Sequence, residues 1–425
     1  MPIHPSTVSI NGFKGLDNIH SPESTNPSFL KKALNIDIDT NGKIVKRQGY
    51  VLKDSGNYKS IFSSINNLGC YAVKNGDLVI VNNDYSSTII KANIGNFDVS
   101  FEEVDNLIFF VSPNTSGIIK DKKVIPWGID CNFTVPNLSY IQGTLPSGTY
   151  QVSVTYINNQ GIESGTGHAS IITIPNNSNI SVDIPVPSPN NSDIIYAKVY
   201  CSTPDGNTLY YSGVSLLNNV YIISDIHSLI SPLKTFNLDK PPLGTIVKYY
   251  NGRMYIVVGN ILYYTQPYMY HHINYSTNYI EFSSDILEVM PTEDGIWVCS
   301  DRIYYLSGNS PDQFILSVKE EVKVVPGTST KFSGSYLHMD NAPPGYKWII
   351  TTNVGIFVLF NQGVLANVTS SFLSPSISSK GTGVFLQQNG MNSYLSILEE
   401  KKKENNSVFG DLVEATIIRN GNIIS

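Results

Sequence analysis

The chain is 425 residues long, 41% of them hydrophobic, and its 28 Lys and Arg residues against 34 Asp and Glu residues give a formal net charge of −6. This length exceeds one ordinary compact core, so we expect two domains, or one propeller-like domain with an insert. The composition is rich in Asn, Ser, Ile, Gly and Tyr, which suits strands and turns, and the charge excludes a basic footprint for gripping nucleic acid.

Residues 1–60 are predicted to form an extended N-terminal arm followed by a first hairpin. Three prolines exclude regular strand pairing through much of this stretch: Pro5, Pro22 and Pro27. The dipeptide Asn41-Gly42 predicts a tight turn between Leu34–Asp39 and Lys43–Val51. Since such an arm cannot build its own core, we expect it to lie against a neighbouring subunit or an adaptor.

Residues 61–143 are predicted to form the first part of a β-propeller. An apolar strand, a Gly or Asn turn and a second strand recur there, for example at Cys70–Val73, Leu78–Val81, Thr88–Lys91 and Leu107–Val111. Turn residues at spacings of about ten residues are typical of sandwiches and propellers.

The pattern changes over residues 144–235. In Gly148–Ile157, the side chains of Tyr150, Val152, Val154 and Tyr156 alternate with polar ones. Four further strands are expected at Ala169–Ile174, Ile180–Ile184, Ile194–Ser202 and Leu209–Val214. About seven strands in about eighty residues predict an inserted two-sheet sandwich of the immunoglobulin or fibronectin type.

Residues 236–425 are predicted to hold the remainder of the propeller and the C-terminal closing strands. Sets of four strands recur about every forty residues, as propeller blades do. The first set is Ile246–Tyr250, Arg253–Val258, Ile261–Thr265 and Tyr279–Phe282. The second is Ile286–Pro291, Gly295–Ser300, Arg302–Ser307 and Gln313–Val318, and the third is Ser335–Met339, Tyr346–Thr351, Gly355–Asn361 and Gly363–Val368. The best helix candidates are Ser28–Leu34 and Ser393–Lys402.

Several short motifs suggest a metal or catalytic site, and each has a simpler interpretation. Asp37–Gly42 matches the start of an EF-hand calcium loop, but Gln48 stands where the loop needs Glu, so a hairpin turn is favoured. His271-His272 has no further ligand at metal-binding spacing and lies among tyrosines. Ser202–Thr208 resembles a sialidase Asp-box with its Asp one position late, which favours an ordinary turn.

No acid–base pair of carboxylates is apparent. Glu293-Asp294 and Glu320-Glu321 are adjacent pairs, which we expect to point in opposite directions. The aromatic residues at Tyr249-Tyr250 and from Tyr263 to Tyr275 suit either a protein interface or packing between blades. We therefore expect no enzyme, and no catalytic, cofactor-binding or metal-binding residue.

The cysteines and the N-terminal residues bear on location. Four cysteines lie far apart, which favours free buried thiols over a zinc site or a disulfide scaffold: Cys70, Cys131, Cys201 and Cys299. The sequence has no signal-peptide pattern and no apolar run of membrane-spanning length, so we expect synthesis in the cytoplasm and no membrane insertion.

Several segments together resemble the tail nozzle or tail hub proteins of short-tailed bacteriophages. They include Asn11–Asn18, Ala33–Asp39 with Gly42–Tyr50, Pro242–Gly244 with Tyr250–Tyr255, and Asp294–Val298 with Tyr304–Gly308. The segment containing Gly148–Tyr150 and Gly161–Ser164 is similar to the fibronectin-type inserts of phage structural proteins.

This resemblance implies an all-β fold: a β-propeller with an inserted immunoglobulin/fibronectin-like sandwich and an extended arm. It implies a homo-oligomeric ring, a hexamer, below the portal and adaptor proteins of a virion tail. The ring would extend the DNA-ejection channel, hold tail fibres or a plug, and meet DNA only in passing. The alternatives are a carbohydrate-binding or glycan-degrading propeller protein of a tail and a bacterial surface adhesion protein.

Overall fold

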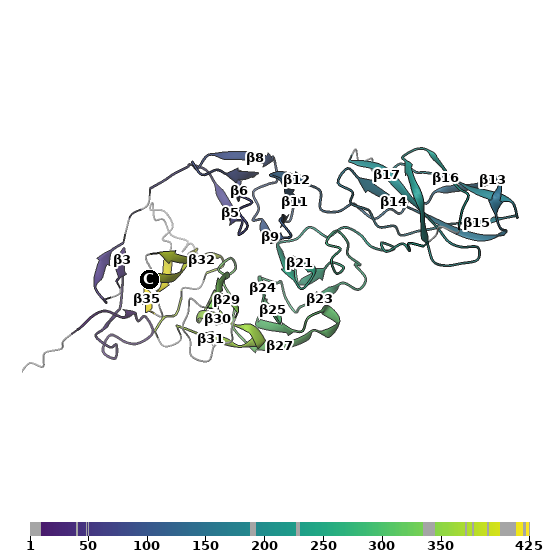
Figure 1. Cartoon of the computed structure of the whole chain (residues 1–425). Helices are drawn as coiled ribbons and strands as arrows, with labels where there is room; N and C mark the ends of the chain where they lie inside the picture. The colour runs from purple at the N-terminus through teal and green to yellow at the C-terminus, as the bar shows by residue number, and fades with distance from the viewer. Residues whose placement is uncertain are drawn as a thin grey trace, which may run out of the picture. The chain divides into compact units, whose positions relative to one another are not determined.

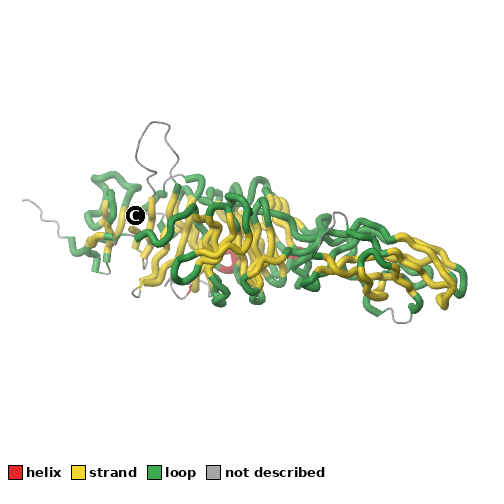
Figure 2. Tube along the Cα trace, turned by 90° about the horizontal axis from the view of Figure 1, so that it is seen from above, coloured by secondary structure: helices red, strands yellow, loops and turns green. Residues whose placement is uncertain are grey.

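The computed structural model describes residues 10–39, 41–47, 49, 51–187, 193–226, 230–334, 345–369, 372–375, 378–388, 391–399, 414–419 and 422–424. Strands and loops make up almost all of this part of the chain, as Figure 2 shows in yellow and green. It contains no α-helix, and therefore no helix of membrane-spanning length and apolarity. The all-β prediction is confirmed.

Several four-stranded antiparallel sheets along the chain have their strands paired in sequence order. The first is β5 (Tyr58–Ser63), β6 (Cys70–Lys74), β7 (Asp77–Val81) and β8 (Ser87–Lys91), and the second is β9 (Ser100–Val104), β10 (Leu107–Val111), β11 (Ser116–Lys120) and β12 (Lys123–Ile125). A third is β20 (Ile246–Tyr250), β21 (Arg253–Val258), β22 (Ile261–Tyr264) and β23 (Tyr279–Glu281). This repetition is consistent with a β-propeller (Figure 1).

Residues 56–281 form one compact unit, in which these three sheets pack in succession. Tyr71 and Phe101 belong to a buried cluster shared by the first and second sheets. Phe109 and Met254 belong to another, shared by the second and third. The amide of Val247 also donates to Ser100 Oγ at 3.0 Å, so the second and third sheets meet although β13 to β19 lie between them in sequence.

Those intervening strands form two further sheets, here called the two-sheet module. One is β13 (Asn137–Leu145), β16 (Ser178–Asp183) and β19 (Val220–Ile223). The other is β15 (Ser170–Ile174), β14 (Gly148–Asn158), β17 (Ile194–Cys201) and β18 (Tyr210–Leu216). They share one core, which holds the alternating side chains of β14: Tyr150, Val152, Val154 and Tyr156.

The second compact unit joins residues 1–55 to residues 282–425. Two of its sheets are four-stranded: β24 (Glu288–Pro291), β25 (Gly295–Cys299), β26 (Ile303–Ser307) and β27 (Ile315–Glu320), then β28 (Thr330–Ser333), β29 (Tyr346–Thr352), β30 (Gly355–Leu359) and β31 (Leu365–Asn367). The third runs in the order β2 (Phe29–Leu30), β1 (Gly15–Leu16), β35 (Asn422–Ile424), β34 (Glu414–Arg419), β33 (Met391–Leu398) and β32 (Gly381–Gln388). The first and last strands of the chain therefore share a sheet, with Gly15 paired in parallel to Ile423.

Both helix predictions are wrong. Phe29–Leu30 is a strand because it pairs in parallel with Gly15–Leu16. Met391–Leu398 is a strand because it lies between β32 and β34 and pairs with both, and its Tyr394 and Ser396 are buried. The first strand of the third predicted set lies at Thr330–Ser333. Ser335–Met339, where we expected it, lies outside the described residues.

The described part of the N-terminal arm packs against its own chain, and its expected contact with a neighbouring subunit or an adaptor stays a prediction. Leu16 is 6% exposed and belongs to a cluster with Ile349, Ile356 and Tyr394 of the same chain. Phe29 stacks on Phe372, with ring centroids 4.6 Å apart. The arm thus contributes to a core of its own chain, because its few apolar residues are spaced to meet the last two sheets.

Candidate functional site: the N-terminal loop and the base of the two-sheet module

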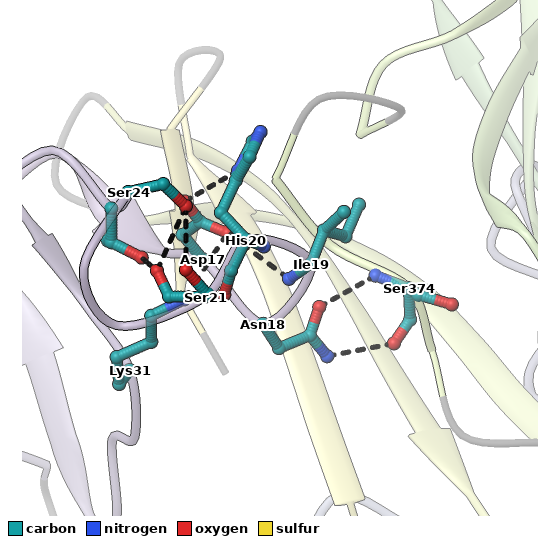
Figure 3. Close-up of polar contacts among 9 residues, drawn as sticks. Asp17, Asn18, Ile19, His20, Ser21, Ser24, Lys31 and Ser374 are labelled. Carbon is teal, nitrogen blue, oxygen red and sulfur yellow. Dashed lines mark hydrogen bonds and ion pairs between the residues drawn. The ribbon is translucent and has the colours of Figure 1, made fainter.

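A buried carboxylate organises the N-terminal loop that follows β1 (Figure 3). The side chain of Asp17 is 3% exposed and accepts hydrogen bonds from the amides of Ile19 and His20, at 3.1 and 3.0 Å. It also meets His20 Nδ1 at 2.9 Å, and Lys31 Nζ lies 3.9 Å away. Burial alone would raise the pKa of Asp17, but the hydrogen bonds from His20 and Ile19 hold that pKa below its ordinary value.

The same loop is fastened to a distant part of the chain. Asn18 Nδ2 donates to the carbonyl of Ser374, and the amide of Ser374 donates back to Asn18 Oδ1, both at 2.9 Å (Figure 3). The amide of Asn18 also donates to the carbonyl of Phe372 at 3.0 Å. One side chain therefore ties the start of the chain to a segment 356 residues later.

The exposed side of this loop offers no assembled nucleophile. The His20 side chain is 47% exposed and is oriented by Asp17, as in a catalytic dyad. The two nearby hydroxyls, however, pair with each other, since Ser21 Oγ and Ser24 Oγ lie 3.0 Å apart. Asp17 therefore acts as a structural carboxylate that shapes the loop.

A second dense region is the base of the two-sheet module, where four segments meet. We call it the junction and define it as residues 127–132, 165–166, 235–240 and 266–273. On the module side, the amide of Asn132 donates to Gly165 O at 3.0 Å, and that of Asn237 donates to Thr166 O at 2.8 Å. A Cβ on Gly165 would lie 1.7 Å from Leu238 O, so only glycine permits this approach.

On the other side of the junction, the connecting segments hydrogen-bond to the loop between β22 and β23. Trp127 Nε1 donates to the carbonyl of Tyr270 at 2.8 Å. Asp239 and Ile273 exchange two backbone hydrogen bonds of 2.8 and 2.9 Å. The two segments that connect the module to the neighbouring sheets are thus held by this one loop.

A cavity of about 660 Å³ lies beside the junction. Its lining includes charged residues of both signs, namely Lys91, Asp130, Asp193, Asp239 and Lys240. Two of the carboxylates are engaged in structure: Asp130 pairs with Lys240 at 2.7 Å, and Asp239 accepts the amides of Cys131 and Lys240. Burial lowers the pKa of Lys91.

The adjacent histidines of the sequence analysis lie in the junction. His272 is 6% exposed, and among the described residues neither ring has a hydrogen-bond partner at its buried Nδ1 atom. Burial, followed by repulsion from His272, lowers the pKa of His271 to about 4. Burial also lowers the pKa of His272, although the charges of Glu163 and Asp239 act to raise it.

Two motifs form the turns that were predicted. Asp39 Oδ1 accepts the amides of Asn41 and Lys43, each at 2.8 Å, between strands β3 (Ile36–Ile38) and β4 (Ile44–Lys46). Gly42, at φ 76°, lets this turn lie directly against Gly12. Asp205 Oδ1 accepts the amide of Thr149 at 2.9 Å in the turn between β17 and β18.

The expectation for Glu293-Asp294 is wrong. Asn361 Nδ2 donates to Glu293 Oε2 at 3.3 Å, while the amide of Gln362 donates to Asp294 Oδ2 at 2.8 Å. Both carboxylates therefore contact one turn, Asn361–Gly363. They can do so because Glu293 and Asp294 lie in the loop between β24 and β25, where side chains do not alternate as they do in a regular strand. Asp294 also accepts the hydroxyl of Tyr305 at 2.7 Å.

Two of the tyrosines in the aromatic stretches pack between sheets, and the use of these stretches in a protein interface stays a prediction. Tyr249 and Tyr270 pack edge to face at 6.1 Å, and Tyr270 meets Phe109 of the preceding sheet at 5.8 Å, so both belong to packing between sheets. Tyr268, in contrast, is 76% exposed. The sequence did not reveal the roles of Asp17, Asn18 and Trp127; a short Gly-Leu strand followed by Asp-Asn was the available signal for the first two.

Comparisons with known proteins leave the chain without a family. No family model matches it, and no curated protein matches it. The structure has distant similarity to β-propeller proteins. A crystal structure of BBS1N in complex with ARL6DN, soaked with lead, has 9% identity and a TM-score of 0.31, covering 82% of this chain and 91% of that chain. The AfRom2 CNH domain has 7% identity and a TM-score of 0.18, covering 69% and 90%.

Proposed function

We propose that the chain is a structural protein of a bacteriophage tail: a nozzle or hub subunit whose β-propeller carries an inserted fibronectin-like sandwich. One observation carries the proposal. Two of the segments that resemble such proteins lie at joints of the all-β framework. Asn11–Asn18 contains the side chain that fastens the N-terminal loop to Ser374, and Tyr250–Tyr255 forms the turn between β20 and β21.

In this proposal six copies form a ring below the portal and adaptor of the virion tail, extend the DNA-ejection channel, and hold tail fibres or a plug. A ring of this kind needs subunit interfaces of well over ~2,000 Å². Strand β27 offers apolar surface for them, since Ile315, Leu316 and Val318 are 69%, 48% and 48% exposed. The net charge of −6 suits a wall past which DNA slides.

Mass spectrometry of purified particles tests the proposal. Particles of the phage that encodes the chain should contain it in a fixed ratio to the portal protein, and tails separated from heads should retain it. A chain found in host cells or their surface fraction, and absent from washed particles, would contradict the proposal and favour the adhesion protein.

Among the described residues, the cavity beside the junction favours a glycan-binding tail protein instead. Its lining combines carboxylates with Tyr275, residue types that commonly contact sugars. Glycan-array binding that is lost in Tyr275→Ala would support this second candidate, and release of reducing ends from a capsule polysaccharide would make it an enzyme.

A further inference from the structure

The adjacent histidines, His271 and His272, lie between two points at which the 266–273 loop is hydrogen-bonded to the connecting segments. The carbonyl of Tyr270, directly before His271, accepts the indole N–H of Trp127, and Ile273, directly after His272, exchanges two hydrogen bonds with Asp239. Within the loop, the amide of His272 donates to Met269 O at 3.0 Å, and its carbonyl accepts the amide of Gln266 at 2.9 Å. The two rings therefore lie between the two points at which the loop holds the connecting segments.

The site accommodates these rings in their neutral form. A neutral imidazole leaves one nitrogen without a proton, whereas a protonated one is an N–H donor at both nitrogens. The Nδ1 atoms of His271 and His272 are buried, and among the described residues neither has an acceptor. Protonation in the closed junction therefore buries a charged donor without a partner, which is unfavourable.

The neighbouring charges do not remove this penalty. The charges of Glu163, from the module, and of Asp239, from a connecting segment, act on His272. Lys198 pairs with Glu163, Lys240 pairs with Asp130, and Tyr270 directly precedes His271 in the loop. Both carboxylates that act on His272 already accept other donors. Asp239 accepts two backbone amides, and Glu163 accepts Lys198 and Tyr200, each at 2.6 Å.

We propose that the junction is an acid-released clasp, in which protonation of His271 and His272 opens the 266–273 loop and frees the two-sheet module from sheet β20–β23. This inference does not depend on the proposed tail function. The folded pKa of His271 is about 4 and that of His272 is also lowered, against an ordinary value of 6.5. The open junction binds protons first as pH falls, so the closed form is fully favoured above pH 6.5 and is lost progressively toward about pH 4.

Hydrogen–deuterium exchange of the full chain tests the clasp. Rates measured at pH 7.5 and pH 5.0, corrected for the intrinsic pH dependence of exchange, are compared for peptides spanning 127–132 and 266–273. Protonation of His271 alone should raise the equilibrium constant for opening of the junction about 25-fold between pH 7.5 and pH 5.0. Peptides from β25 and β26, which contain no histidine, should change by less than about twofold. Equal behaviour of the two sets would overturn the proposal.

Three variants separate titration from packing. His271→Gln/His272→Gln should reduce the pH effect to less than about twofold, whereas His168→Gln, outside the junction, should keep it. Trp127→Phe removes a clasp hydrogen bond without touching an ionisable group, so it should raise exchange at both pH values and preserve their ratio. If the double variant is already open at pH 7.5, His271→Gln is used alone. Retention of the 25-fold rise in His271→Gln/His272→Gln, or in His271→Gln where that variant is used, refutes the clasp.

Discussion

Trp297 and Trp348 lie on two successive sheets, and each donates a hydrogen bond to a backbone carbonyl in or next to the other's sheet. Trp297 Nε1, on β25, donates to the carbonyl of Phe360 at 2.9 Å, directly after β30. Trp348 Nε1, on β29, donates in the opposite direction to the carbonyl of Pro291 in β24, at 2.8 Å. Both indoles lie in the same buried cluster, so hydrophobic packing and two buried hydrogen bonds fix the same interface. Trp127 repeats the arrangement in the junction, so all three tryptophans of the chain join one segment to a neighbouring one.

Replacement of Trp348 by Phe tests this relationship. The variant leaves the buried carbonyl of Pro291 without its donor, which costs about 1–3 kcal/mol, and it also opens space in the core. The free energy of unfolding from urea titration should fall by at least that amount. Tyr346→Phe is the matched control, because its side chain is 54% exposed and its loss of a hydroxyl should change stability by less than about 0.5 kcal/mol. Equal stabilities of the two variants would show that the indole bond contributes nothing.

The N-terminal strand should be part of the folded core. Leu16→Ala removes a buried side chain from the cluster that contains Ile349 and Tyr394, and we expect a loss of about 2–5 kcal/mol. Ile19→Ala, at a side chain 46% exposed, is the control and should cost much less. Thermal and urea unfolding of the two variants measure the difference. A Leu16→Ala protein as stable as the parent would contradict this role of the N-terminal strand in the core.

The stabilisation that Asp17 gives to the N-terminal loop should be lost at low pH. The folded pKa of Asp17 lies below the ordinary value of 3.8, so this contribution is fully present above pH 3.8 and is lost as pH falls through the folded value. Asp17→Asn removes this dependence. The difference in unfolding free energy between the parent and the variant should therefore shrink as pH falls below about 4. A difference that stays the same below pH 4 would contradict the hydrogen-bonded placement of the Asp17 carboxylate.

DNA affinity separates a conduit from a protein that holds DNA. Each phosphate gripped by Lys or Arg adds affinity, and the chain has a net charge of −6, with its largest basic run at Lys401–Lys403, outside the described residues. Gel-shift titration of the purified protein should show no binding tighter than the non-specific range of ~10⁻⁴ to 10⁻⁶ M at physiological salt. Nanomolar binding would indicate a holding function.

Local sequence patterns predict the bounds of many strands well, but they do not predict the contacts between segments that are distant in sequence. The strands from Ile246 to Tyr264 lie within one residue of their predicted bounds, because Asn251-Gly252 and Gly259-Asn260 mark their turns and the apolar runs between them are short. Ser393–Lys402 is one of the best helix candidates in the sequence, but Met391–Leu398 pairs with strands on both sides, and this pairing overrides local preference.

The candidate site illustrates the same limit of local patterns. The bonds between Asn18 and Ser374 join residues 356 positions apart, and nothing in either local sequence specifies the other. The histidines were noticed in the sequence as a possible metal site, but their place between Trp127 and Asp239 comes only from the meeting of four distant segments.

Electron microscopy of the isolated tail tests the proposed function most directly. A reconstruction of tails from the encoding phage should show copies of this chain arranged as a six-fold ring around an axial channel, below the portal and adaptor. The wall that faces the channel should be neutral or acidic, lined with Asn, Ser, Asp and Glu. A tail whose ring is built from another protein, with this chain absent or bound as a single copy, would contradict the account.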